Sequence, residues 1–138
     1  PYFCLLNVGG LRSSLNEGSI LLEDVYKLMP FDNEIVIVEL PFSSLDEIVN
    51  YLIERGGEPI SNAVLNDSHL EFNDGATRFN SFYVITSDYL MNGGDDMEFF
   101  QNQLSVIYTD VLMRDAMIEQ VRKQGVLIFN SEERIILE

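Results

Sequence analysis

Hydrophobic and polar positions follow two different periods in the first third of the chain. Residues 2–7 and 34–40 ("EIVIVEL") are short apolar runs without helical spacing, which predicts strands, and we expect the second to be covered on both faces. Between residues 20 and 29 the apolar side chains fall at helical spacing instead. That pattern predicts a short helix that Pro30 ends, because proline disfavours a helical conformation at the residue before it.

The clearest helical pattern covers residues 44–55, where five apolar side chains share one face. The sequence "SLDE" at its start predicts a capping box between Ser44 and Glu47. The remaining expected elements are strands at 60–66, 69–72 and 82–90, a helical turn and then a strand within 97–108, a helix at 111–124 capped by Thr109 or Asp110, and one or two strands in the tail 126–138. Together these elements predict an α+β fold, a single layered domain with mixed β-sheets packed between helices.

The length of 138 residues fits one domain, and no internal repeat or linker divides it. The chain starts at Pro1, directly before an expected strand, so we expect an N-terminally truncated domain. Eight basic and 23 acidic residues give a formal charge of −15, which disfavours nucleic acid and anionic membranes as partners. No apolar run approaches the ~18 residues of a membrane span, so we expect no membrane insertion.

Residues that could ligate a metal or act as a nucleophile are few. His69 is the single histidine, in an expected strand, and we interpret it as a surface or half-buried residue. The single cysteine, Cys4, cannot form an internal disulfide, and burial in its strand is favoured over reactivity. Asp95 and Asp96 alone are weak evidence for a cation site. The sequence therefore predicts neither a metal centre nor a Ser/His/Asp triad within this chain.

Two glycine-containing turns carry the candidate chemistry. "NVGGLR" (7–12) places an amide and the Arg12 guanidinium beside backbone that a ligand can approach closely, although an ordinary strand-to-helix turn explains it as well. "MNGGDD" (91–96) offers the Asp95 carboxylate, which could accept hydrogen bonds from two ribose hydroxyls. Phe31, after the helix-ending proline, is either core or presented to a ligand.

Taken in order, "NVGGLR", "EDVYKLMPFDNEIVIVEL" and "VITSDYLMNGGDD" resemble the C-terminal domain of the 5′-nucleotidase family, a bifunctional metallophosphatase family. The resemblance extends over "SLDEIVNYLIERGG" and the closing "SEERIILE". It implies the fold of that domain and a role in nucleotide binding. It also implies that hydrolysis belongs to a separate metallophosphoesterase domain with two divalent metal ions, absent from this chain, and that the protein is periplasmic, extracellular or surface-anchored.

Carried over position by position, the resemblance implies that Asn7 and Arg12 contact base, ribose or phosphate. It implies that Phe31 and Tyr89 form an aromatic clamp on the base, and that Asp95 belongs to the same site. The expected substrate-binding residues are Asn7, Gly9, Gly10, Arg12, Phe31, Tyr89, Asn92, Gly93, Gly94 and Asp95, with no catalytic or metal-binding residue among them. Three positions depart from the family pattern, namely Leu11 for isoleucine, Tyr89 for phenylalanine and Asp96 for glycine, and the last is expected to alter the loop.

The expected function is therefore recognition of a nucleotide or nucleoside for a 5′-nucleotidase-like phosphohydrolase in nucleotide catabolism. A stand-alone, non-catalytic nucleoside- or nucleotide-binding module is the main alternative. The same domain in a nucleotide-sugar or cyclic-phosphate hydrolase is the other. Because the chain lacks ligands for a metal pair, we expect it to be inactive without a metallophosphoesterase domain in the same or a separate chain.

Overall fold

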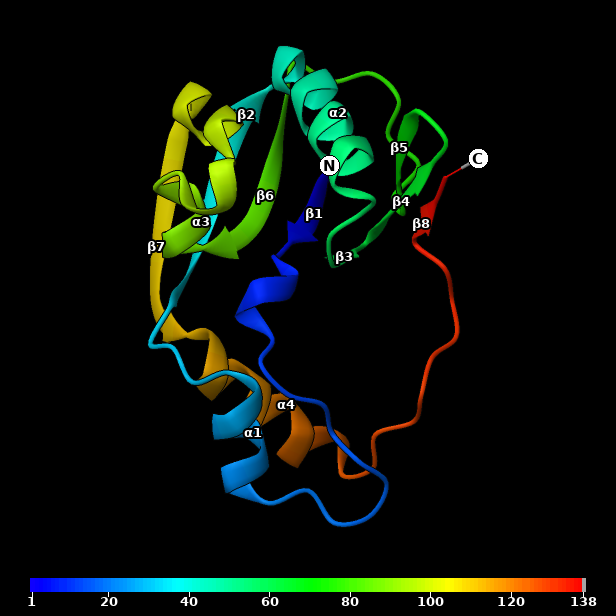
Figure 1. Cartoon of the computed structure of the whole chain (residues 1–138). Coiled ribbons are helices and arrows are strands. Elements are labelled where there is room, and N and C mark those ends of the chain that lie inside the picture. The colour runs from blue at the N-terminus through cyan, green and yellow to red at the C-terminus, as the bar shows by residue number, and fades with distance from the viewer. Residues whose placement is uncertain (138) are drawn as a thin grey trace.

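The computed structural model describes residues 1–137, which form two mixed sheets and four α-helices (Figure 1). The larger sheet has the order β3 (Ile60–Ser61), β1 (Tyr2–Leu5), β6 (Ser81–Ser87), β2 (Glu34–Pro41) and β7 (Ser105–Leu112), and the smaller sheet has the order β5 (His69–Phe72), β4 (Ala63–Asn66) and β8 (Ile135–Ile136). The helices are α1 (Leu22–Leu28), α2 (Leu45–Arg55), α3 (Asp88–Met91) and α4 (Met113–Gln124). The pairs β1/β6 and β4/β8 are parallel and the others antiparallel, so the expected α+β fold with mixed sheets is confirmed.

The hydrophobic core joins one face of the larger sheet to α2 and to the segment 90–100 that follows β6 (Figure 1). Fully buried side chains alternate along the central strands, as with Val36 and Val38 on β2, and belong to the same core as Ile48 and Leu52 of α2. Phe72 of β5 packs edge-on to Phe3 of β1, with ring centroids 5.9 Å apart. The smaller sheet therefore shares this core with β1. The first glycine turn leaves from the end of β1.

Two local expectations from the sequence are wrong. Ser44 does not form the capping box with Glu47, because it has a helical backbone (φ −78°, ψ −10°) and its hydroxyl accepts a hydrogen bond from the Asn102 side chain at 3.1 Å instead. Strand β2 is not covered on both faces. Alternate residues such as Val38 are buried, whereas Ile37 on the opposite face is only partly buried.

Several boundaries also differ from the sequence pattern. The expected strand 60–66 is interrupted at Asn62, whose φ of +64° breaks the extended backbone. The expected strand 82–90 ends at Ser87, because the Ser87 hydroxyl accepts the Leu90 amide and starts the helical turn α3. Leu112 rather than Thr109 or Asp110 is the N-cap of α4. The tail contributes only the short strand β8, and its last residue, Glu138, lies outside the described residues.

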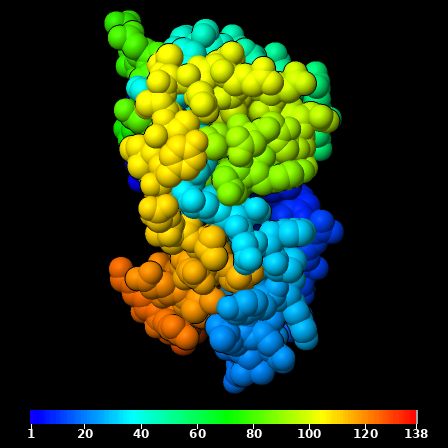
Figure 2. Space-filling view, turned by 90° about the vertical axis from the view of Figure 1, so that its left-hand side faces the viewer, coloured from blue at the N-terminus to red at the C-terminus, as the bar shows by residue number. Residues whose placement is uncertain are grey.

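Helices α1 and α4 lie side by side at the end of the molecule away from α2 (Figures 1 and 2). The segment after α1 returns from this helix pair to β2, and the Met113 amide donates to the Asn33 carbonyl at 2.9 Å. Phe31 therefore lies where the helix pair meets the larger sheet. Within residues 1–137, no helix is long and apolar enough to cross a membrane.

Candidate functional site

The first glycine turn leaves the end of β1 and is held by buried groups. The Thr86 hydroxyl donates to the Leu5 carbonyl at 2.7 Å, and the buried Glu58 carboxylate accepts the Val8 amide at 2.8 Å. A Cβ atom added at Gly10 would lie 2.9 Å from Oδ1 of Asn7. Glycine is therefore required at position 10 so that the largely buried Asn7 side chain can lie across the turn.

The second glycine turn follows β6 and shapes the position of Tyr89. The Tyr89 ring packs directly against Gly94, where an added Cβ would lie 2.5 Å from the ring atoms Cε1 and Cζ. Gly93 has a φ of +95°, a conformation that L side chains rarely adopt. The turn thus needs its two glycines for different reasons, Gly93 for the backbone and Gly94 for the aromatic ring.

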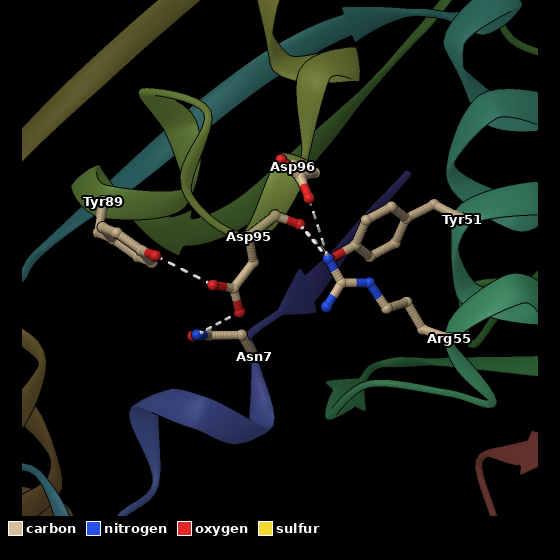
Figure 3. Close-up of polar contacts among 6 residues, drawn as sticks. All are labelled: Asn7, Tyr51, Arg55, Tyr89, Asp95 and Asp96. Atoms are coloured by element: carbon tan, nitrogen blue, oxygen red, sulfur yellow. Dashed lines mark hydrogen bonds and ion pairs between the residues drawn. The ribbon is translucent and has the colours of Figure 1, made fainter.

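Asp95 joins the two turns (Figure 3). Its Oδ2 accepts a hydrogen bond from the Asn7 amide at 2.7 Å, and its Oδ1 accepts one from the Tyr89 hydroxyl at 3.0 Å. Its backbone carbonyl accepts the Tyr51 hydroxyl and an Arg55 guanidinium nitrogen of α2, both at 2.7 Å. These four bonds hold Asp95 in the left-handed conformation, with φ +53°, that presents its carboxylate between Asn7 and Tyr89.

The electrostatics of this network favour a neutral Tyr89. The hydrogen bond that Tyr89 donates to the Asp95 carboxylate, together with the negative charge of that carboxylate, raises the pKa of the phenol. Each Asp95 oxygen accepts one bond from the protein, and a carboxylate has about four lone-pair positions in all. The carboxylate can therefore still accept hydrogen bonds from the hydroxyls of a ligand.

Asp96 also has a left-handed backbone, with φ +60°. Its side chain is directed towards Arg55, with 3.7 Å between the charged atoms, whereas Asp95 is directed towards Asn7 and Tyr89 (Figure 3). Because the Asp96 side chain is 91% exposed, this ion pair stabilises the loop only weakly.

Phe31 and Arg12 form another wall of the site. Phe31 is 42% exposed, so it is not a core residue, and the Arg12 guanidinium carbon lies 5.1 Å from the centroid of its ring. This distance fits a cation–π contact. The Arg12 backbone amide donates to the Leu28 carbonyl of α1 at 2.8 Å, which ties the end of the first turn to the helix before Phe31.

These walls enclose one pocket of about 250 Å³, which is lined by Asn7, Gly9, Gly10, Arg12, Phe31, Asn33, Tyr89 and Asp95. A smaller chamber of about 20 Å³ shares Asn7 and Phe31 with it and is also lined by Ser87 and Met113. Seven of the ten site residues expected from the sequence line the larger pocket. Asn92, Gly93 and Gly94 do not, and they border a shallow surface with Tyr89 and Asp88.

Asn33 is a pocket residue that the sequence analysis did not single out. It comes two positions after Phe31, and this proximity in the sequence was the available signal. Other sequence-derived candidates lie elsewhere. His69 is exposed on β5, and Cys4 is partly buried on β1, where burial raises the pKa of its thiol. Among residues 1–137, no group of three or more His, Cys, Asp or Glu side chains is arranged to hold a metal ion.

Comparison with known proteins connects this geometry to one family. Residues 1–57, which include the first turn, Phe31 and α2, match the model of the family "5′-nucleotidase, C-terminal domain". The structure superimposes on that of a 5′-nucleotidase precursor from Thermus thermophilus with a TM-score of 0.81 over 98% of this chain, at 20% identity. The first 57 residues thus match the 5′-nucleotidase C-terminal domain, and the fold of the chain is that seen in the 5′-nucleotidase precursor.

Two further proteins are similar to this chain over nearly its whole length. The Haemophilus influenzae NAD nucleotidase (NadN) matches in structure with a TM-score of 0.79 over 99% of the chain, at 12% identity. A 5′-nucleotidase-related protein from Glossina morsitans morsitans is 22% identical over 96% of the chain. The chain spans only 31%, 29% and 28% of the Thermus, Haemophilus and Glossina proteins, respectively.

Proposed function

We propose that this domain recognises a nucleoside or nucleotide as the substrate-binding half of a 5′-nucleotidase-like phosphohydrolase. One observation carries the proposal: Phe31 and Tyr89, 58 positions apart in the sequence (89 − 31), line a single pocket together with Asp95 and Arg12. In the proposed complex the base stacks between the two aromatic rings. The ribose hydroxyls donate to Asp95, and Arg12 lies on the side of the phosphate.

The aromatic side chains support a role in stacking. Phe31 and Tyr89 are 42% and 48% exposed, whereas the core phenylalanines Phe3, Phe82 and Phe100 are almost completely buried. Two exposed aromatic rings at one pocket provide flat surfaces for a base, each worth about 1–3 kcal/mol per stacked base. Any base offers such a π-face, so stacking supplies affinity and leaves selectivity to polar groups such as Asn7 and Asn33.

The polar groups support recognition of a sugar. Asp95 is fixed by hydrogen bonds from two side chains before any ligand arrives, so binding would not have to order it. Arg12 supplies a positive charge at the pocket of a chain whose formal charge is −15. A phosphate would be repelled by most of this surface, and its favourable position is therefore beside Arg12.

Hydrolysis is proposed to need two divalent metal ions held by a metallophosphoesterase domain in the same or a separate chain. Such an ion pair clamps the attacking and leaving oxygens in phosphoryl transfer. The first test is therefore an assay of this chain with AMP and Mn²⁺, Zn²⁺ or Co²⁺. We expect no turnover above a metal-only blank, and turnover that survives repurification would contradict this division of roles.

The binding test uses adenosine and AMP with ligand-detected NMR. We expect a dissociation constant of about 1 mM, equivalent to about −4 kcal/mol, because the ligand stacks in an open pocket. Phe31→Ala and Tyr89→Ala should each weaken binding by about 1–3 kcal/mol, whereas Tyr89→Phe, which keeps the ring, should cost little. Phe129→Ala is the matched control, because Phe129 is 90% exposed and does not line the pocket.

A second comparison tests the sugar contact. Asp95→Asn should weaken the binding of adenosine more than that of free adenine, because the proposed partner of the carboxylate is the ribose. Saturation-transfer signals from adenine protons that persist unchanged in a Phe31→Ala, Tyr89→Ala double variant would refute the proposed clamp.

A further inference from the structure

We infer that Arg114 is a positioning residue that fixes the Phe31 wall of the pocket. The inference rests on the proposed function for its effect on ligand binding, while its effect on the Phe31 ring can be measured without any ligand. Arg114 is the second residue of α4, 83 positions from Phe31 in the sequence (114 − 31).

The Arg114 guanidinium reaches the chain on both sides of Phe31. Its Nη1 donates to the Met29 carbonyl at 3.2 Å and lies 3.5 Å from the Phe31 carbonyl, and its Nη2 contacts Oδ1 of Asp32 at 2.6 Å. The same guanidinium carbon lies 4.2 Å from the centroid of the Tyr26 ring on α1. One planar group therefore connects α1, the Phe31 segment and α4.

Burying the Arg114 guanidinium costs free energy, and the contacts that offset this cost lie on the Phe31 segment and its neighbouring helix. Arg114 is only 8% exposed, and its Nε is buried without a hydrogen-bond partner among residues 1–137. A positive charge in the first turn of a helix also opposes the helix dipole, so α4 itself gains nothing from it. The stabilising contacts of the guanidinium all lie on the segment that carries Phe31 and on Tyr26 of the neighbouring helix.

The contacts explain how an exposed ring can keep one orientation. Phe31 itself is 42% exposed, so packing fixes its backbone only in part. The rigid Arg114 guanidinium contacts the carbonyls of residues 29 and 31 through Nη1 and the Asp32 carboxylate through Nη2, which restricts the backbone on both sides of Pro30. Lysine could keep the charge, but it cannot reproduce this planar set of contacts.

The first test measures the ring directly. The sequence contains no tryptophan, so Phe31→Trp introduces a single tryptophan at the pocket wall, whose fluorescence can be excited separately from that of the six tyrosines. In this background Arg114→Met should increase the amplitude of fast depolarisation of the tryptophan, because the segment loses its anchor. Arg122→Met removes an exposed arginine of the same helix and should leave the depolarisation unchanged. Equal depolarisation with and without the Arg114→Met substitution would overturn the inference.

The second test measures binding with the native Phe31. We expect Arg114→Met to weaken adenosine and AMP binding by the same factor, at least fivefold, because the buried guanidinium acts through Phe31. A larger loss for AMP would indicate direct phosphate contact and would overturn the positioning role. If Arg114→Met does not fold, Arg114→Lys replaces it, with an expected loss of at least threefold, and unchanged affinity and depolarisation in this variant would also overturn the inference.

The two tests separate this inference from the proposed function. If the unmodified chain binds neither adenosine nor AMP, the proposed function fails, and the depolarisation measurement still decides whether Arg114 holds residue 31. If the unmodified chain binds and the Arg114 variants bind equally well, only the positioning role fails.

Discussion

Gly94→Ala tests whether the position of the Tyr89 ring matters for binding. The added Cβ would lie 2.5 Å from Cε1 and Cζ of the ring, whereas ordinary carbon contacts are about 3.5–4.0 Å. The ring must therefore move by about 1–1.5 Å. Such a movement also breaks the 3.0 Å hydrogen bond from the Tyr89 hydroxyl to Asp95.

The expected cost falls on binding rather than on folding. Gly94 does not have a positive φ, so alanine adds no backbone strain, and Tyr89 is 48% exposed and can rotate into solvent. We expect the free energy of unfolding to change by less than about 0.5 kcal/mol. Adenosine binding should weaken by about 1 kcal/mol, or roughly fivefold, because part of the stacking energy is lost.

Gly93→Ala is the matched control with the opposite expectation. No atom lies within 4 Å of its added Cβ, but its φ of +95° strains an alanine, so stability should fall by about 1–2 kcal/mol with little change in affinity. Chemical denaturation and NMR titration measure the two effects. In a Tyr89→Ala background, Gly94→Ala should cause no further loss of binding. An equal loss in both backgrounds would refute the steric argument.

Three further predictions concern charged and titrating groups. Because the bond to Asp95 raises the pKa of Tyr89, the bond persists below the ordinary value of about 10 and is lost as the pH rises through the raised value. Asp95→Asn should therefore lower the Tyr89 midpoint, seen as the tyrosinate absorbance that Tyr89→Phe removes, and an unchanged midpoint would contradict the assigned cause. Arg12→Ala should weaken AMP binding more than adenosine binding, with a smaller difference at high salt, and equal losses would place Arg12 away from the phosphate. Asp96→Gly should raise the free energy of unfolding by about 0.5–1 kcal/mol in chemical denaturation, because glycine adopts the positive φ without strain. The exposed ion pair with Arg55 that this change removes contributes little, and a decrease in the free energy of unfolding would show that the pair contributes more than the strain costs.

The sequence pattern was sufficient for elements whose period is local. The apolar face of 44–55 and the run 34–40 correspond to α2 and β2, since burial on one face imposes a period that survives in the sequence. It failed where side-chain contacts with distant residues decided the outcome. The Asn102 side chain donates a hydrogen bond to the Ser44 hydroxyl, which was expected to cap α2. The Ser87 hydroxyl accepts the Leu90 amide, so residues 88–91 form a helical turn and do not continue the strand.

The candidate site also combines local signals in the sequence with contacts between distant residues. By themselves the two glycine turns were ordinary loop signals, and their resemblance to one family suggested a common site. The structure adds the reason for each residue type, since the Gly94 position leaves room for a ring and Asp95 accepts hydrogen bonds from Asn7 and Tyr89. Hydrogen bonds between residues 88 positions apart leave no period in a sequence and could not have been derived from it.

The sequence by itself determined the strands and helices with a strong apolar period, the acidic character of the chain and the motifs that resemble the 5′-nucleotidase C-terminal domain. The tertiary structure alone decided that Asn33 joins the pocket, that Asn92 lies outside it, and that Arg114 holds the segment of Phe31. The physical reason is that a chain's local period records only which side of an element is buried. Which polar groups meet across the pocket depends on how α1, α4 and the larger sheet pack together.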